Sequence, residues 1–279
     1  LYLQARVVGF GRVSDAVAQR VASRVVGRHL RAQIPEKYTL PVLRALGRHA
    51  VPHLAQALKD EHSWGRRAAC EALGAIGDAQ AIPHLAHALQ DKNLWVRLEA
   101  CGALGAIGDP QAIPHLAHAL QDEDRSVREA ACKALGAIGD PQAIPHLAHA
   151  LQDEGSGVRE AACRALGAIR DAQAIPHLAH ALQDKNLWVR YTACWALGLI
   201  RDAQAIPHLA RALQDENSWV RRAACGMLGW IGDAHAIPHL VQALQDEDSG
   251  VREAACRALG AIGDAHAIPH LVQALQDED

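Results

Sequence analysis

Apolar residues recur at helical spacing twice within every 31 residues over most of this chain. In segment 78–108 the first group is Ile82, Leu85, Ala86 and Leu89, and the second is Val96, Ala100, Ala103, Leu104 and Ile107. Each group fits one face of an α-helix, and a polar stretch of the type QDKN separates the two. Since no segment alternates with the period of a β-strand, the pattern predicts an all-α fold made of helix pairs.

The helix pair is repeated without a single insertion or deletion. Seven units and a half-unit follow one another: residues 47–77, 78–108, 109–139, 140–170, 171–201, 202–232, 233–263 and 264–279. One pair cannot bury its own apolar stripe, whereas stacked copies bury a continuous one. Residues 47–279 are therefore predicted to form an α-solenoid of stacked antiparallel helix pairs, and residues 1–46 a basic N-terminal helical cap or junction.

Local signals mark the ends of each helix. Pro83 falls in the first turn of the first helix, where a missing N–H is tolerated. Gly108 follows the second helix as a C-cap, and Asp109 is placed to cap the next unit.

The repeated motif resembles a known family. It reads D-x-x-A-I-P-x-L-x-x-A-L-x-D and then V-R-x-x-A-x-x-A-L-G-x-I-G over about five-sixths of the chain. This is similar to the short HEAT-like repeats first named from phycobilisome bilin lyases. The resemblance implies a right-handed-type α-solenoid whose second helices line the concave side.

The copies differ mainly at four outward positions of the second helix, those equivalent to Trp95, Leu98, Gly102 and Ala106. All six Trp residues lie at these positions. In the third, fourth and seventh units the same face carries a Glu followed four residues later by Lys or Arg. Such pairs satisfy each other on a solvated helix surface, so those units are interpreted as inert.

The fifth and sixth units carry large apolar groups instead. They place Trp188, Tyr191, Trp195, Leu199, Trp219 and Trp230 on one face, with Arg222 beside them. Gly226 between two Trp residues would leave a dent for a partner's side chain. Aromatic residues with an Arg are typical of interface hot spots, so this face is the predicted protein-binding or peptide-binding surface. A smaller cluster is predicted at Trp64, Trp95 and Leu98. The alternative is that some Trp rings pack between neighbouring second helices.

Residues that suggest chemistry are assigned to structure. The His pairs at i,i+3 and i,i+4, such as His84 and His87, have chelating spacing but no third ligand, so no metal site is predicted. Deoxyhypusine hydroxylases also use HEAT-like repeats, with iron-binding His-Glu dipeptides, and this chain has no such dipeptide. One Cys per unit is too widely spaced for disulfides. Asp91 and Arg97 have equivalents in every complete unit. They are expected to cap the second helices and to form a regular series of hydrogen bonds between repeats, here called the ladder. No cofactor and no catalytic residue is predicted, and the chain is interpreted as a non-enzyme.

Composition and charge limit the partners. Half the residues are hydrophobic and the formal net charge is −3, which disfavours a nucleic-acid clamp, and no stretch is long enough to cross a membrane. Residues 1–50 hold nine basic and two acidic residues, against 19 and 29 in the remainder. Ser14 is expected to open an amphipathic helix with Val17, Val21 and Val25 in one row and Arg20, Arg24 and Arg28 in another, with Arg31 beyond. The cytoplasm is the expected compartment.

Other functions remain as alternatives to the binding scaffold. Because the chain begins at Leu1 and stops after half a unit, it is interpreted as a piece of a longer protein. It could then be the ligand-sensing arm of a nucleotide-dependent signalling protein. A bilin-lyase-like subunit would use the aromatic face for a tetrapyrrole. A self-assembling repeat protein would use its ends, where Leu271, Val272 and Leu275 lack a covering helix.

Overall fold

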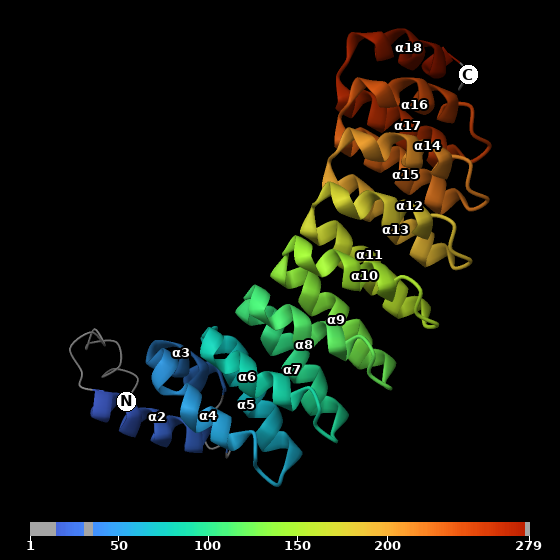
Figure 1. The fold of residues 1–279 in the computed structure, drawn as a ribbon. Helices are drawn as coiled ribbons and strands as arrows, with labels where there is room; N and C mark the ends of the chain where they lie inside the picture. Colours follow the sequence, from blue (N-terminus) through green and yellow to red (C-terminus); the bar gives the residue numbers. More distant parts are fainter. Residues whose placement is uncertain (1–14, 31–35, 277–279) are drawn as a thin grey trace. The chain divides into compact units, whose positions relative to one another are not determined.

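The computed structural model of the chain describes residues 15–30 and 36–276 (Figure 1). They divide between two compact units, residues 1–142 and residues 143–279. The regular structure of the described residues consists of α-helices and short 3₁₀ turns, without a β-strand. The predicted all-α class is therefore confirmed.

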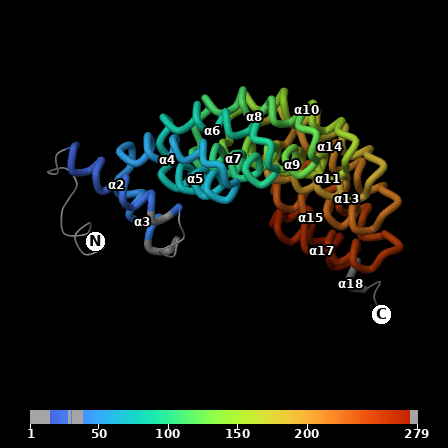
Figure 2. The backbone as a smooth tube through the Cα atoms, turned by 90° about the horizontal axis from the view of Figure 1, so that it is seen from below, coloured from blue at the N-terminus to red at the C-terminus, as the bar shows by residue number. Residues whose placement is uncertain are grey.

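The helices follow the predicted pairing. In the first compact unit, α2 and α3 precede three pairs; in order, the helices are α2 Asp15–Leu30, α3 Glu36–Leu46, α4 Val51–Ala57, α5 Ser63–Ile76, α6 Ile82–Ala88, α7 Leu94–Ile107, α8 Ile113–Ala119 and α9 Arg125–Ile138. In the second they are α10 Ile144–Ala150, α11 Ser156–Ile169, α12 Ile175–Ala181, α13 Leu187–Ile200, α14 Ile206–Ala212, α15 Ser218–Ile231, α16 Ile237–Ala243, α17 Ser249–Ile262 and α18 Ile268–Gln276. Within each of the two compact units, the second helices of consecutive repeats pack side by side. Figure 2 shows α6 and α8 in one row beside α7 and α9 in another.

The predicted helix signals work as expected. Gly108 has φ 72°, and its N–H donates to the carbonyl of Leu104 at 3.3 Å. The Asp109 Oδ1 atom accepts from the N–H of Gln111 at 2.8 Å, and Pro83 lies in the first turn of α6. Each unit thus ends one helix with a left-handed residue and starts the next with an acidic cap.

Two units end their second helix differently. Arg170 after α11 and Arg201 after α13 have φ 57° and 58°, where the other second helices of complete units end in glycine. A side chain in this left-handed conformation brings its Cβ close to the backbone. The two arginines therefore hold strained positions.

The core lies between the stacked pairs. Leu85 of the first helix and Val96, Ala100 and Leu104 of the second are fully buried. Neighbouring second helices touch backbone to backbone, since a Cβ added to Gly105 would lie only 2.9 Å from the Cα of Ala134. Because only Gly and Ala lie at this contact, the backbones of neighbouring second helices can approach closely.

Buried ion pairs link one repeat to the next. In α11, Arg159 donates from Nε and Nη2 to the two carboxylate oxygens of Asp184 at 2.6 and 2.8 Å. Its Nη1 also donates to the carbonyls of Asp153 and Glu154 at 2.9 and 3.1 Å. The equivalent pairs are Arg66 with Asp91, Arg97 with Asp122, Arg190 with Asp215 and Arg221 with Asp246. The predicted inter-repeat ladder is confirmed.

Asp184 shows how the ladder balances burial against hydrogen bonding. Burial acts to raise the pKa of this carboxyl, but the hydrogen bonds from Arg159 and from the N–H of Asn186 outweigh it. The pKa therefore lies below its ordinary value. The ionised form stabilises the fold above the pKa of an unfolded Asp, and this contribution is lost as the pH falls through the folded pKa.

The N-terminal helices only partly match the prediction. Helices α2 and α3 pack on α4 and α5, but the buried face of α2 consists of Ala18, Ala22, Val25 and Val26. Of the expected row, Val25 is buried and Val21 is half-buried, but Val17 is 42% exposed. Small Ala side chains let α2 approach its neighbours more closely than a row of Val would.

Some predicted residues lie outside the described part of the chain. These are Ser14, Arg31 and the side chains of Arg28 and Leu275. On α18, Ile268 and Val272 are exposed and Leu271 is half-buried.

Asp184→Ala should lower the free energy of unfolding by about 3 kcal/mol, because Arg159 would stay buried without its carboxylate. Glu160→Gln is the matched control, since it breaks the exposed Arg164–Glu160 pair of the same helix and should cost under about 0.5 kcal/mol. Urea unfolding of the full chain measures both. Equal losses would show that the ladder does not link the repeats.

Arg170→Gly should raise the free energy of unfolding by about 1 kcal/mol, because glycine adopts a positive φ without strain. The reciprocal change, Gly139→Arg at the end of α9, should lower it by a similar amount. Thermal and urea unfolding provide the measurement. No gain from Arg170→Gly would mean that the left-handed position is not strained.

Candidate functional site

All six tryptophans lie on the outward face of second helices and are exposed. Their exposed fractions run from 43 to 61%. Four belong to the second compact unit, with Trp188 and Trp195 on α13 and Trp219 and Trp230 on α15. Each ring therefore offers a large apolar surface to solvent.

Helix α13 carries a row of aromatic rings. The ring of Tyr191 meets Trp188 edge-on with centroids 6.0 Å apart, and it meets Trp195 at 6.2 Å. Asn186 caps the helix by accepting from the N–H of Trp188 at 2.9 Å. One turn beyond Trp195, Leu199 is half-buried. The three rings thus hold one another in place along the helix.

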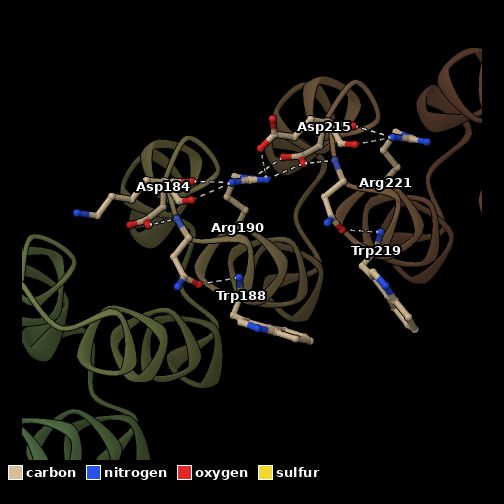
Figure 3. Close-up of polar contacts among 10 residues, drawn as sticks. Asp184, Trp188, Arg190, Asp215, Trp219 and Arg221 are labelled. Carbon is tan, nitrogen blue, oxygen red and sulfur yellow. Dashed lines mark hydrogen bonds and ion pairs between the residues drawn. The ribbon is translucent and has the colours of Figure 1, made fainter.

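The aromatic side chains and the buried ladder lie on opposite sides of the second helices. In Figure 3, Trp188 and Trp219 project from their helices away from Arg190, Arg221 and Asp215. The ladder fixes the joint between repeats on one side. The other side is exposed to solvent.

A groove lies at the outward face of α13, α15 and α17. Its volume is about 390 Å³, and it is lined by Tyr191, Trp195, Trp219, Arg222, Ala223, Gly226, Met227, Gly229, Trp230, Ala254, Arg257, Ala258 and Ala261. Gly226, where a dent was expected, lines this groove, and a Cβ added there would meet no atom within 4 Å. Aromatic walls and a floor of small residues are a shape that can receive a side chain.

Met227 distinguishes the joint beside this groove. The other complete units have Ala at this position, and at the joints with Gly74, Gly105, Gly167 and Gly229 the added Cβ comes closest to the Cα of that Ala. Here the side chain of Met227 lies against Gly198 instead. Sequence reasoning missed this residue, although a single Met in the chain at a position otherwise held by Ala was a usable signal.

Two arginines lie over the tryptophans of α15. The Arg222 guanidinium is 5.1 Å from the centre of Trp219, and that of Arg201 is 4.7 Å from the centre of Trp230. Arg201 also donates from Nη2 to the carbonyl of Trp230 at 3.5 Å. Arg201 was not identified from the sequence. It could have been found, because it replaces the glycine that ends the second helix in most repeats.

The units predicted to be inert carry ion pairs on the same face. Arg164 pairs with Glu160 at 3.0 Å on α11, and Arg257 pairs with Glu253 on α17. On α9 the predicted partner was wrong, because Glu129 pairs with Arg125 at 2.7 Å rather than with Lys133. Positions i−4 and i+4 of a helix are equally near, so the pattern alone does not select between them.

The smaller cluster lies in the first compact unit. Trp64 of α5 and Trp95 of α7 are exposed, and Leu98 is half-buried. Arg67 and Glu99 form an ion pair at 3.2 Å between the same two helices. Charges on this face are therefore partly neutralised within the chain.

The cysteines are packed in the helix interfaces, whereas the His pairs such as His84 and His87 are exposed. Among the described residues, no three His, Cys, Asp or Glu side chains come together as a metal site. All seven cysteines are thiols, and burial raises the pKa of Cys101 to about 12. A thiol that stays protonated at neutral pH is a poor nucleophile. None of the described helices could cross a bilayer.

A family model described as HEAT repeats matches the chain repeatedly. The matched residues are 14–97, 51–128, 88–161, 114–189, 150–224, 181–252 and 212–279. This confirms the resemblance drawn from the repeated motif. No curated protein matches the chain significantly.

Several solved structures are similar to the chain. Human deoxyhypusine hydroxylase in complex with glycerol is 27% identical over 89% of this chain and 98% of that one, with a TM-score of 0.42. The complex of CpcE and CpcF of phycocyanin lyase from Nostoc is 24% identical over 81% and 92%, with a TM-score of 0.48. A structure of Kap95p with RanGDP is 15% identical over 92% and 43%, with a TM-score of 0.59. The last shows a shared fold.

Acrylamide should quench the fluorescence of the folded chain as one population, because every tryptophan is exposed by similar amounts. A linear quenching plot with a slope near that of the urea-unfolded chain is the expected result. A plot that curves downward would reveal protected rings and contradict the exposed face.

Proposed function

Because the chain belongs to the HEAT-repeat family, we propose that it is a non-catalytic module that binds a protein or peptide through the second helices of its fifth and sixth units. HEAT-repeat solenoids are typically protein-binding scaffolds and usually lack catalytic activity. The proposed surface consists of Trp188, Tyr191, Trp195, Leu199, Trp219, Arg222 and Trp230, here called the aromatic face.

The observation that carries this proposal is the exposure of four Trp rings on adjacent helices, three of which, Trp195, Trp219 and Trp230, line a groove. A large aromatic side chain has about 150 to 250 Å² of surface. Four such rings at half exposure, together with Tyr191, approach the largest apolar patch that a typical monomer leaves in water, which is about 300 to 600 Å² and often functional. The cost of keeping this surface wet supports a partner that covers it.

The composition of the aromatic face also supports binding. Trp, Tyr and Arg dominate the hot spots of protein interfaces, and hot spots lie in pockets that exclude water once the partner is bound. The groove at Gly226 provides such a pocket beside Arg222. Trp188, Tyr191 and Trp195 hold one another in place, so little side-chain entropy would be lost on binding.

The neighbouring helices support the same location. On α11 and α17 the outward face carries Glu–Arg pairs that satisfy each other in water. Those helices gain little from a partner. The buried thiols of the array favour a reducing compartment, and we place the protein in the cytoplasm.

Trp188→Ala combined with Trp219→Ala should weaken partner binding by more than about 2 kcal/mol, roughly thirtyfold in Kd, with little change in melting temperature. Proteins captured by the native chain and lost from this variant are identified by mass spectrometry, produced separately and titrated by calorimetry. Circular dichroism follows the melting.

The comparison variant replaces Trp64 and Trp95 of the smaller cluster, which are equally exposed on the first compact unit. Retained affinity of this variant would assign recognition of the partner to α13 and α15, whereas a matching loss would include the smaller cluster in the binding surface. A large drop in melting temperature at unchanged affinity would make Trp188 and Trp219 structural residues and would remove the proposal.

A further inference from the structure

We infer that the aromatic face takes an acidic peptide segment, which inserts a large apolar side chain at Gly226 and places carboxylates against Arg222 and Arg201. This inference rests on the proposed function and names the chemistry of its partner. It depends on the charges around the groove as well as on its shape.

The helices of the aromatic face contain no acidic residue. The sequences LWVRYTACWALGLI of α13 and SWVRRAACGMLGWI of α15 lack both Asp and Glu. The ladder pairs Arg190 and Arg221 with buried carboxylates on the other side of these helices. The groove is lined by Arg222 and Arg257, and Arg201 lies beside Trp230. Glu253 of α17 is the acidic group next to them, and it pairs with Arg257.

Arg201 and Arg222 make no ion pair within the described residues. Arg257 pairs with Glu253, and the nearby carboxylate of Asp248 accepts from the N–H of Val251 at 3.1 Å to cap α17. Arg222 nevertheless lies near the carboxylates of Asp248 and Glu253. The hydrogen bond from Arg257, and after it the charge of Arg222, holds the pKa of Glu253 below the ordinary value. Both stacked arginines keep N–H groups that are not used in an ion pair. A carboxylate is the partner that a guanidinium binds most strongly through two parallel hydrogen bonds.

The stacking prepares both arginines for such a partner. A guanidinium that lies over an indole ring keeps its N–H groups at the edge, free for a carboxylate. The guanidinium of Arg222 lies 3.1 Å from where a Cβ on Gly250 would be, so the absence of a side chain at Gly250 leaves room for it. Arg201 is held in a strained backbone conformation at φ 58°, where most units place glycine.

The remainder of the array opposes other partners. Residues 51–279 carry 19 basic and 29 acidic residues, so the aromatic face is a positive site on a negative chain. A nucleic acid needs several phosphates neutralised along its length, and few cations are available here. A short acidic segment can reach the two arginines without lying along the acidic array.

The test is a selection from a random peptide library displayed on phage. The native chain is the bait, and the Gly226→Leu variant removes peptides that bind elsewhere. Leu at this position fills the groove and improves the helix, since a Cβ there meets nothing within 4 Å. Gly102→Leu on α7 is the matched control, because that position is equally open and lies outside the groove.

We expect the selected peptides to share Asp or Glu on both sides of a large apolar residue. The consensus peptide should bind the native and Gly102→Leu chains alike and should lose binding to Gly226→Leu. Changing its Asp and Glu to Asn and Gln should weaken binding at least about tenfold. On the Arg222→Gln chain the same change should have a smaller effect, which fluorescence anisotropy measures at low salt.

Other results would overturn the inference in distinct ways. Neutral or basic peptides that still need Gly226 would overturn the acidic chemistry and leave the proposed function standing. If no peptide is enriched over the Gly226→Leu bait, peptide recognition at the groove is wrong. A doubled mass in light scattering that Gly226→Leu abolishes would make a second copy of the chain the occupant, and groove-dependent binding of single-stranded DNA would make it a nucleic acid.

Discussion

Every helix pair in this chain must be covered by the next, because a single pair leaves its apolar stripe in water. Backbone contacts such as Gly105 on Ala134 set how closely the second helices approach, and buried pairs such as Arg159 with Asp184 tie their loops together. In every repeat that these two contacts join, they use the same faces of the second helix, which are therefore buried. The outward positions of the second helices are then the ones free to vary, and there the chain carries its distinguishing side chains.

The framework itself changes where the surface chemistry changes. Between α13 and α15 the contact of Gly with Ala is replaced by Gly198 with Met227, and α13 ends at Arg201 in a left-handed conformation. Both departures cost packing or backbone strain. They occur beside the groove and its stacked arginines. Arg170 at the end of α11 has the same left-handed conformation away from the groove, so against the joints at Gly74, Gly105, Gly167 and Gly229 only the Gly198–Met227 contact sets this one apart.

Much of the fold could be predicted because its signals are local. The positions of Pro83, Gly108 and Asp109 depend on a few neighbouring residues, and a period of 31 residues repeats them. The outward direction of the Trp side chains follows from helix geometry alone. Helix geometry alone does not decide which of two nearby charged side chains a residue pairs with. For this reason Glu129 was assigned to Lys133, although it pairs with Arg125. The buried face of α2 was missed for a related reason: Ala18 and Ala22 are weak apolar signals that acquire meaning only when a neighbour packs on them.

The sequence by itself determined the repeat, its helix boundaries and the set of side chains that face outward, since these follow from spacing and from short-range preferences of the backbone. Only the tertiary structure decided that the rings remain exposed, that Gly226 opens into a groove lined by three helices, and that Arg201 reaches Trp230 in the following unit. Those features depend on distances between segments about thirty residues apart in the chain. Such distances are set by stacking, and no periodicity within one unit contains them.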